Sequence, residues 1–241
     1  MNIALIGYGK MGKTIETIAK IRGHKIVLII EKKNLMELNR INLKKVDVAI
    51  DFSTPNSART NIMKAIDSGI PVISGTTGWL DQFSEVIAYC DKKKGCFLYA
   101  SNFSLGVNLF FELNKKMTEI MKQHEQYEVE VHEIHHKEKT DSPSGTAITL
   151  AEQIIAENKS FQRWSQNEIS AEKSIKIVSE RKEKITGIHQ VNYNSQMDNI
   201  SIKHKAHSRK AFALGAIIAA EWIKDKNGCY SMRDVLFSKK H

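Results

Sequence analysis

The residues best suited to proton transfer and anion binding gather in one short stretch, residues 133–147. Two adjacent histidines, His135 and His136, precede Lys139, and a Pro-Ser-Gly-Thr sequence follows. Imidazole and ammonium groups can exchange protons near neutral pH once burial or neighbouring charge has shifted their pKa values. If a helix starts at this sequence, its first backbone amides and the two hydroxyls would form a pocket for a carboxylate. The stretch therefore predicts a site that moves a proton and binds an anion.

A metal site is an alternative interpretation of this stretch, because His132 and Glu133 lie beside the two histidines. Alternation along a strand would send His132 and His136 to the face opposite His135, so the three imidazoles would not converge on one ion. The neighbouring lysines also disfavour a cation. The sequence therefore predicts no metal ligand.

A glycine pattern at the start of the chain is typical of dinucleotide binding. It follows an aliphatic run at residues 2–6 and precedes residues with helical spacing, which is the context that the pattern requires. Its glycines permit a tight turn, the approach of a pyrophosphate and close helix packing. The helix start supplies amide donors and positive potential. The predicted cofactor-binding residues of this loop are Gly7, Tyr8, Gly9, Lys10, Met11 and Gly12.

The residues after the second predicted strand bear on the choice of cofactor. Glu31 ends that strand, nineteen residues after Gly12, where a carboxylate can accept hydrogen bonds from the ribose hydroxyls of NADH. Lys32 and Lys33 follow and could meet the 2′-phosphate of NADPH. The sequence therefore predicts NADH or NADPH as cofactor without deciding between them, and a solvated charge cluster is the alternative.

Two turns rich in small residues fall where the fourth and fifth predicted strands end. Ligands bind at the carboxyl edge of open parallel sheets, so the backbone amides of these turns could hold the nicotinamide end of the cofactor. As isolated sequences both are ordinary turns, and only their position favours binding. The predicted residues are Gly75, Thr76 and Thr77 in the first turn and Ala100, Ser101, Asn102 and Phe103 in the second.

These residues need a scaffold, and the apolar pattern predicts one of the α/β class. Short aliphatic runs alternate with stretches of helical spacing through the first hundred residues. Alternating strands and helices predict a Rossmann-type, doubly wound parallel sheet. The strands are expected near residues 2–6, 25–30, 46–51, 71–74 and 96–99.

After Phe103 the pattern changes to that of a second, α+β domain with an open mixed sheet. The sequence predicts a dinucleotide-binding domain, residues 1–103 completed by 210–241, and a substrate-binding domain, residues 104–209. The expected elements are helices near 106–123, 145–157 and 210–224, a polar stretch from about 158 to 172, and strands near 128–134, 174–179, 187–194 and 199–204.

Composition limits the class of protein. With 41% hydrophobic and 26% charged residues, the 241-residue chain is near the average for soluble globular proteins. Residues 211–220 form the densest apolar run, half the roughly 20 residues of a membrane span, and the N-terminus lacks the pattern of an export signal. Three cysteines without metal-type spacing favour a reducing, cytoplasmic location.

The net charge of +9 comes from the two ends of the chain. Residues 1–103 carry 15 basic and 9 acidic side chains, residues 210–241 carry 6 and 3, and the middle is neutral. This surplus would suit a module that handles an anionic ligand, although a merely basic surface is an equal alternative.

These motifs together resemble the 4-hydroxy-tetrahydrodipicolinate reductase family, also called dihydrodipicolinate reductase, over nearly the whole chain. The most specific motif is His-His-x-x-Lys-x-Asp-x-Pro-Ser-Gly-Thr-Ala at 135–147. A turn at Gly187-Ile188-His189 also resembles the family and is interpreted as structural. The other matching motifs are the glycine loop at 7–12, Asp-Phe-Ser at 51–53, Gly-Thr-Thr-Gly at 75–78 and Asn-Phe-Ser-x-Gly-Val-Asn at 102–108.

The resemblance implies an NAD(P)H-dependent enzyme that reduces 4-hydroxy-tetrahydrodipicolinate, with loss of water, to tetrahydrodipicolinate in the diaminopimelate pathway of lysine biosynthesis. It implies that His135 is a proton donor or acceptor and Lys139 a proton donor. It also implies a homotetramer whose second domains pair their sheets edge to edge. By similarity, the contacts to the small cyclic dicarboxylate substrate are His136, Ser144, Gly145 and Thr146, and Arg209 is a candidate carboxylate clamp.

Two other functions stay open. Another Rossmann-fold, amino-acid-linked dehydrogenase would share the glycine loop but would have no reason for paired histidines and Pro-Ser-Gly-Thr. A non-catalytic, dinucleotide-sensing regulator could use the basic surplus on nucleic acid, yet the basic residues are scattered without a recognition helix or an aromatic-lined strip. We therefore expect a small-molecule substrate and no nucleic-acid or membrane partner.

Overall fold

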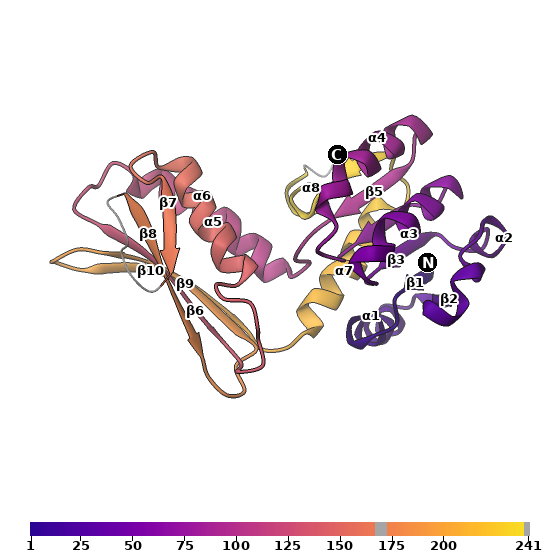
Figure 1. Ribbon diagram of the computed structural model, residues 1–241, viewed down its shortest axis with the longest axis horizontal. Coiled ribbons are helices and arrows are strands. Elements are labelled where there is room, and N and C mark those ends of the chain that lie inside the picture. Colours follow the sequence, from indigo (N-terminus) through magenta and orange to yellow (C-terminus); the bar gives the residue numbers. More distant parts are fainter. Residues whose placement is uncertain (167–172, 239–241) are drawn as a thin grey trace. The chain divides into compact units, whose positions relative to one another are not determined.

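The computed structural model describes residues 1–166 and 173–238, which form two compact units (Figure 1). The first unit comprises Met1–Leu105 and the described chain from Arg209 onward, and the second comprises Gly106–Ser208. Separate clusters of buried apolar side chains fill the two units, so each unit is described by itself.

The described part of the first unit contains a sheet of six parallel strands in the order β11-β5-β4-β3-β1-β2. Parallel neighbours need crossover connections, which helices supply here. The Rossmann-type, doubly wound sheet predicted from the sequence is confirmed. The strands are β1 (Asn2–Ile6), β2 (Lys25–Ile30), β3 (Val48–Asp51), β4 (Val72–Ser74), β5 (Cys96–Tyr99) and β11 (Gly228–Tyr230).

Helices cover both faces of this sheet, because alternate residues of each strand enter two different cores. Ile3 and Leu5 of β1 pack into the core formed with α1 (Lys10–Ile21) and α7 (Lys210–Ile223). Ala4 and Ile6 pack into the core formed with α3 (Pro55–Asp67) and α4 (Phe83–Lys93). The short elements are α2 (Arg40–Leu43), α8 (Met232–Phe237) and 3-10 helices at Lys32–Glu37 and Leu80–Gln82.

Helix α7 completes the first unit from a distant part of the chain. Its buried face is made largely of alanines, with one glycine, and packs on α1 and on β3, β4 and β5. Strand β11 follows and pairs with β5. The sequence did not predict β11, which is only three residues long. The first sheet thus depends on segments at both ends of the chain.

The second unit contains a mixed sheet in the order β10-β9-β6-β8-β7. Strand β9 is antiparallel to β6 and β10, whereas β8 is parallel to β6 and β7. Helices α5 (Leu105–Met121) and α6 (Gly145–Glu157) share a core with one face of this sheet, so the predicted open mixed sheet is confirmed. The strands are β6 (Glu128–His135), β7 (Arg163–Gln166), β8 (Ser174–Arg181), β9 (Gly187–Asn194) and β10 (Asn199–Ala206).

Strand β7 lies within the polar stretch from about 158 to 172, where the sequence predicted no strand. Residues 163–166, with the sequence Arg-Trp-Ser-Gln, form an edge strand that pairs with β8. Residues 167–172 of that expected stretch lie outside the described residues.

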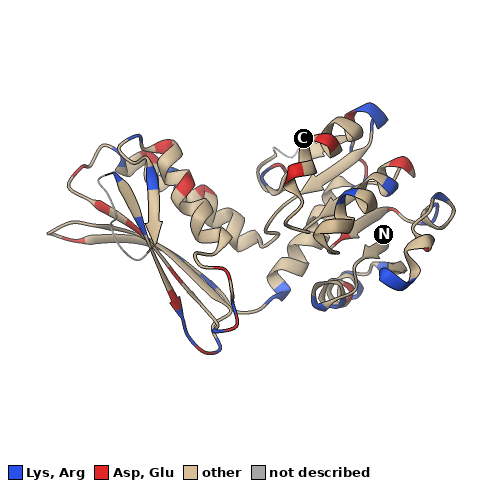
Figure 2. Cartoon of the chain, in the orientation of Figure 1, with Lys and Arg blue, Asp and Glu red and all other residues tan. Residues whose placement is uncertain are grey.

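Charged side chains of both signs are interspersed over both units (Figure 2). Many are paired, as Arg22 is with Glu221 at 2.8 Å and Lys93 with Asp67 at 2.8 Å. Exposed pairs of this kind contribute little to stability. Among the described residues, no helix combines the length and the hydropathy that crossing a membrane requires.

Candidate functional site

The glycine loop lies between β1 and α1, and two of its glycines have no room for a side chain. Gly7 has a φ of +91°, which favours glycine, and a Cβ there would overlap the carbonyl oxygen of Phe52. A Cβ on Gly12 would overlap the carbonyl oxygen of Gly7. Helix α1 begins at Lys10 without a side-chain cap, so its first amides are available to an anion. This backbone fits a pyrophosphate.

Residues from three predicted cofactor segments line one cavity of about 350 Å³ in the first unit. The segments are the glycine loop and the turns after β4 and β5, all at the carboxyl ends of strands. Phe52 and Phe103 form part of the wall, with ring centroids 5.7 Å apart. Arg209, expected at the substrate, lines the same cavity. Other lining residues are Lys10, Met11, Gly75, Ser101 and Asn102.

A buried carboxylate ties the turn after β3 to the turn after β4. Asp51, at the end of β3, is fully buried, and burial raises the pKa of its carboxyl group. Its oxygens accept hydrogen bonds from the hydroxyls of Ser53, Ser74 and Thr76 at 2.6, 2.9 and 2.7 Å. The Thr76 hydroxyl also accepts the backbone N–H of Ser53 at 2.9 Å. Thr76 therefore stabilises the turn from inside, whereas the neighbouring Thr77 is exposed.

The carboxylate of Glu31 is 38% exposed at the end of β2 and has partners on its own turn. It accepts the backbone N–H of Asn34, which caps the 3-10 helix, and lies 3.0 Å from Lys33 Nζ. Lys32 is exposed beside it. The Glu31 carboxylate and the ammonium groups of Lys32 and Lys33 are thus available where the cofactor's ribose is expected.

In the glycine loop, the Tyr8 hydroxyl donates a hydrogen bond to the carboxylate of Glu16 on α1.

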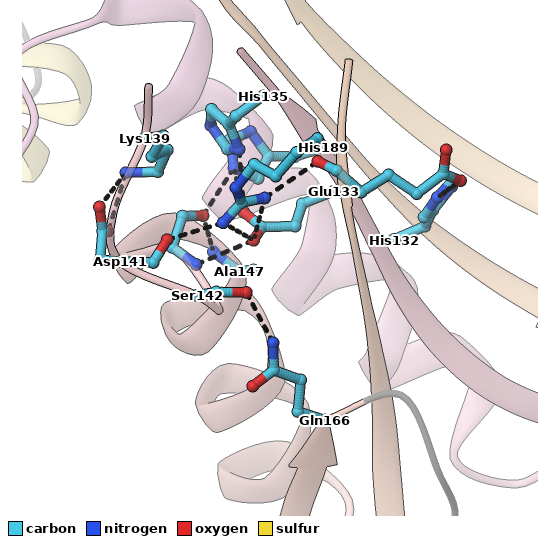
Figure 3. A network of polar contacts seen from close by, with 12 residues as sticks. His132, Glu133, His135, Lys139, Asp141, Ser142, Ala147, Gln166 and His189 are labelled. Atoms are coloured by element: carbon cyan, nitrogen blue, oxygen red, sulfur yellow. Dashed lines mark hydrogen bonds and ion pairs between the residues drawn. The ribbon is translucent and has the colours of Figure 1, made fainter. Parts of the chain in front are cut away.

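In the second unit, Glu133 is the centre of a buried polar network (Figure 3). One carboxylate oxygen, Oε2, lies 3.2 Å from Nδ1 of His135 and 3.7 Å from Nε2 of His189. The other, Oε1, lies 3.4 Å from Arg181 and accepts the backbone N–H of Ser144 at 3.0 Å. The register of the sheet brings the network together, because Glu133 on β6 pairs with His189 on β9.

Burial and neighbouring groups set the charges in this network. Burial alone would raise the pKa of Glu133, but hydrogen bonds from His135 and Ser144 outweigh it and hold that pKa well below its usual range. Burial, and then electrostatic repulsion from His135, lower the pKa of His189 to about 3. At neutral pH the network therefore contains the carboxylate of Glu133 and a neutral imidazole at His189.

Helix α6 begins inside this network. Its N-cap is Ser144, whose hydroxyl oxygen accepts the backbone N–H of Ala147 at 3.3 Å and lies 3.1 Å from Nε2 of His189. The hydroxyl and the amide of Ser144 are thus both used within the protein. Gly145, which is exposed, and Thr146 follow in the first turn of α6. Their amides are the groups that this helix start offers to an anion.

The side chain of Lys139 lies in the loop between β6 and α6. Its Nζ is 2.7 and 2.8 Å from the two carboxylate oxygens of Asp141, and the side chain remains 22% exposed. Burial opposes ionisation of Asp141, but Lys139 outweighs it and lowers the pKa of that carboxyl group. The ammonium group of Lys139 is therefore oriented by Asp141 and accessible.

The neighbouring His136 is half-buried, and its buried Nδ1 has no hydrogen-bond partner among the described residues.

The metal interpretation is tested by where the histidines lie. His132 is on the opposite face of β6 and pairs with a glutamate on β8 at 2.6 Å. Glu133, His135 and His189 bring three possible ligand atoms within 4.8 Å of one another. However, the guanidinium of Arg181 beside Glu133 already supplies a positive charge and disfavours a metal cation. We interpret the cluster as a hydrogen-bonding network.

Both halves of the chain match one known family. Residues 1–103 match the family described as dihydrodipicolinate reductase, N-terminus, and residues 106–236 match dihydrodipicolinate reductase, C-terminus. The 4-hydroxy-tetrahydrodipicolinate reductase of Christiangramia forsetii is 51% identical over 236 residues, with 98% of each chain covered. That of Rickettsia rickettsii is 38% identical over 241 residues, again with 98% of each chain covered. The chain belongs to the dihydrodipicolinate reductase family.

A solved structure from the dihydrodipicolinate reductase family has the same fold. It is the dipicolinate-bound enzyme from Paenisporosarcina sp. TG-14, which superposes with a TM-score of 0.78 over 98% of this chain and 99% of that one. The two sequences are 22% identical, so this likeness concerns the fold alone.

Sequence reasoning missed three residues of the network in this member of the dihydrodipicolinate reductase family: Glu133, Arg181 and His189. A signal for Glu133 was present, because it follows Val129 and Val131 at the two-residue period that points into the core. The sequence placed His189 only in a structural turn. Arg181 ends a strand without a motif around it, so only the pairing of β8 with β6 reveals its role.

Proposed function

We propose that this protein reduces 4-hydroxy-tetrahydrodipicolinate to tetrahydrodipicolinate, with loss of water, using NADH or NADPH, in the diaminopimelate pathway of lysine biosynthesis. The observation that carries the proposal is the 51% identity to a 4-hydroxy-tetrahydrodipicolinate reductase along 98% of both chains. The intact motif at 135–147 and the glycine loop at 7–12 support it from the residues themselves.

The first unit is the proposed dinucleotide-binding domain. The glycine loop and the first amides of α1 suit the pyrophosphate, and Glu31 with Lys32 suits the adenosine ribose. The turns at 75–77 and 100–103 suit the nicotinamide end, supported by the cavity that both help to line. When bound, the cofactor supplies a hydride. The exposed carboxylate and ammonium groups after β2 support the use of either NADH or NADPH.

We assign the proton transfers to His135 and Lys139 in the second unit. Reduction of a conjugated imine leaves an electron-rich carbon in the substrate that must gain a proton, so a positioned acid accelerates the reaction. Lys139 is the proposed donor, since Asp141 orients its ammonium group while the side chain stays partly exposed. His135 is the proposed group for a proton that moves when water is lost, because it is held beside Glu133.

The two carboxylates of the substrate need donors that stay in place. The amides of Gly145 and Thr146 at the start of α6, with the imidazole of His136, form the proposed cradle for one of them. Arg209 is the proposed clamp for a carboxylate, because a guanidinium pairs with it in a bidentate manner. Ser144 contributes by holding the start of α6 through its internal hydrogen bonds.

The proposal includes a cytoplasmic homotetramer, with the second unit as the oligomerisation domain and no nucleic-acid or membrane partner. Helices α5 and α6 cover one face of the five-stranded sheet, and the other carries half-exposed residues such as Glu130 and Lys176. Strand β10, mostly exposed at an edge of this sheet, supports edge-to-edge pairing between copies. The free cysteines Cys90, Cys96 and Cys229 support a reducing compartment.

Steady-state oxidation of NADH and of NADPH with freshly generated substrate tests the activity. We expect loss of the nicotinamide absorbance that depends on both the substrate and the protein. Folded protein that oxidises neither cofactor above background would contradict the proposal. Binding to duplex DNA that weakens with salt, without turnover, would instead favour a regulator.

A further inference from the structure

Glu133 is a fully buried carboxylate inside the functional segment, and no proton transfer or substrate contact is assigned to it above. It contacts groups from four different elements: His135 on its own strand, Ser144 at the start of α6, Arg181 on β8 and His189 on β9. A charge is costly to bury, so a structure that buries one has organised partners around it.

We propose that Glu133 is the positioning residue of the site, which fixes His135 with Nδ1–H toward the carboxylate and anchors the anion-binding start of α6. The inference rests on the proposed function, because it assumes that His135 handles a proton in that reaction. Glu133 itself has no assigned contact with substrate and acts through its two neighbours.

The chemistry of the carboxylate dictates the tautomer of His135. An ionised carboxylate only accepts hydrogen bonds, and Oε2 lies 3.2 Å from Nδ1. The contact is favourable only if Nδ1 carries the hydrogen, so Nε2 is the nitrogen that can take up or release a proton. Nδ1 and Oε2 are both buried and neither forms a hydrogen bond within the described residues, so the 3.2 Å contact with Oε2 is the polar interaction open to Nδ1, and the exposed part of the His135 side chain belongs to other atoms.

The surroundings hold the His135 ring in this orientation. A Cβ on Gly187 would lie 3.1 Å from Nε2 and 3.3 Å from Cδ2 of His135, so this glycine leaves the space that the ring edge needs. The ring of His189 packs against it at 67°, with centroids 4.9 Å apart. A flipped ring would turn a carbon toward the Glu133 carboxylate and lose the contact with Nδ1.

The same carboxylate also holds the helix start. Oε1 accepts the N–H of Ser144 at 3.0 Å, and the residues that follow are Gly145 and Thr146. One group thus sets the positions of the proton-handling imidazole and of the anion cradle. Loss of Glu133 should therefore impair kcat and substrate KM together, while cofactor affinity, which belongs to the first unit, should be unchanged.

The first test is the tautomer of His135 in the wild-type protein, read from the imidazole 15N shifts and assigned with a His135→Gln variant. We expect hydrogen on Nδ1 in the neutral ring. Hydrogen on Nε2 would overturn the proposal. This measurement needs neither turnover nor a folded Glu133 variant, so it decides the proposal even where Glu133→Gln fails to fold. Absence of turnover by the wild type would contradict the proposed function instead.

The second test is kinetic. Glu133→Gln keeps the shape but loses the charge, and we expect kcat to fall roughly 10- to 100-fold, as when the orienting partner of a histidine is removed. The His135 tautomer should become mixed, and Glu133→Asp, which keeps the charge, should recover part of kcat. Glu152→Gln, at an exposed position of α6 in the same unit, is the matched control and should behave as wild type. A folded Glu133→Gln protein with wild-type kcat would refute the positioning role.

Discussion

Acidification should destabilise the folded protein through His189. This side chain is 7% exposed, and burial followed by repulsion from His135 lowers its pKa from 6.5 to about 3. The folded state therefore keeps His189 neutral where the unfolded chain protonates it. Because the folded pKa is depressed, the stabilising contribution is complete above the unfolded value of 6.5 and is lost as pH falls below that value.

The magnitude follows from the two pKa values. Each unit of difference corresponds to about 1.4 kcal/mol, so from about pH 7.5 to about pH 5 the loss is about 2 kcal/mol in the free energy of unfolding. The titration of Glu133 changes the free energy of unfolding little between these two pH values. Its lowered pKa gives stability that is present above its unfolded value of 4.5 and is lost only below that value.

Urea unfolding of the wild type and of His189→Gln at both pH values measures this loss. The glutamine amide can still donate to the Ser144 hydroxyl, but it does not titrate. We expect the stability gap between the two proteins to change by about 2 kcal/mol between the two pH values, since their other titrations cancel. Equal losses in both proteins would show that His189 binds its proton equally in the folded and unfolded states.

Three further predictions concern the reaction and the cofactor. Lys139→Ala should lower kcat by roughly 10²- to 10⁴-fold with the cofactor Kd unchanged, and a loss confined to NADH binding would contradict its assignment to proton donation. Glu31→Ala should weaken NADH more than NADPH, measured as the ratio of their Kd values, whereas equal weakening would mean that the carboxylate does not contact the ribose. Gly12→Ala adds a Cβ against the carbonyl oxygen of Gly7, so the Kd for NADPH in a fluorescence titration should rise by about tenfold or more. An unchanged Kd would show that the loop can shift without loss.

The fold was largely predictable because the apolar residues of its longer helices and strands recur with a clear period. Alternation over 128–134 predicted β6, and Ser144 before an apolar helical pattern predicted α6 from 145 to 157, as observed. Strands β7 and β11 could not be predicted in this way. The first has a mostly polar sequence and depends on the free edge of β8, and the second has three residues and depends on β5, more than a hundred positions earlier.

The candidate site was predictable only where neighbours in sequence are neighbours in space. His135, Lys139 and Ser144 lie within one motif, so their types and spacing are enough to indicate proton transfer and anion binding. Arg181 and His189 join them through the pairing of β6 with β8 and β9, which no local pattern encodes. The glycine loop and the turns after β4 and β5 were predictable together because parallel strands end at one edge of a sheet.

The late position of α7 and β11 in the chain has a consequence for biosynthesis. Translation runs from the N-terminus. The whole second unit, which is continuous from Gly106 to Ser208, therefore emerges from the ribosome before Lys210 does. Until then the side of β5 that later pairs with β11 has no partner strand. The side chains of Ile50 and Ile73, which share a core with α7, are exposed to solvent. We expect the nascent chain to complete the sheet of the second unit first and to depend on chaperones for the N-terminal sheet until the final thirty or so residues arrive.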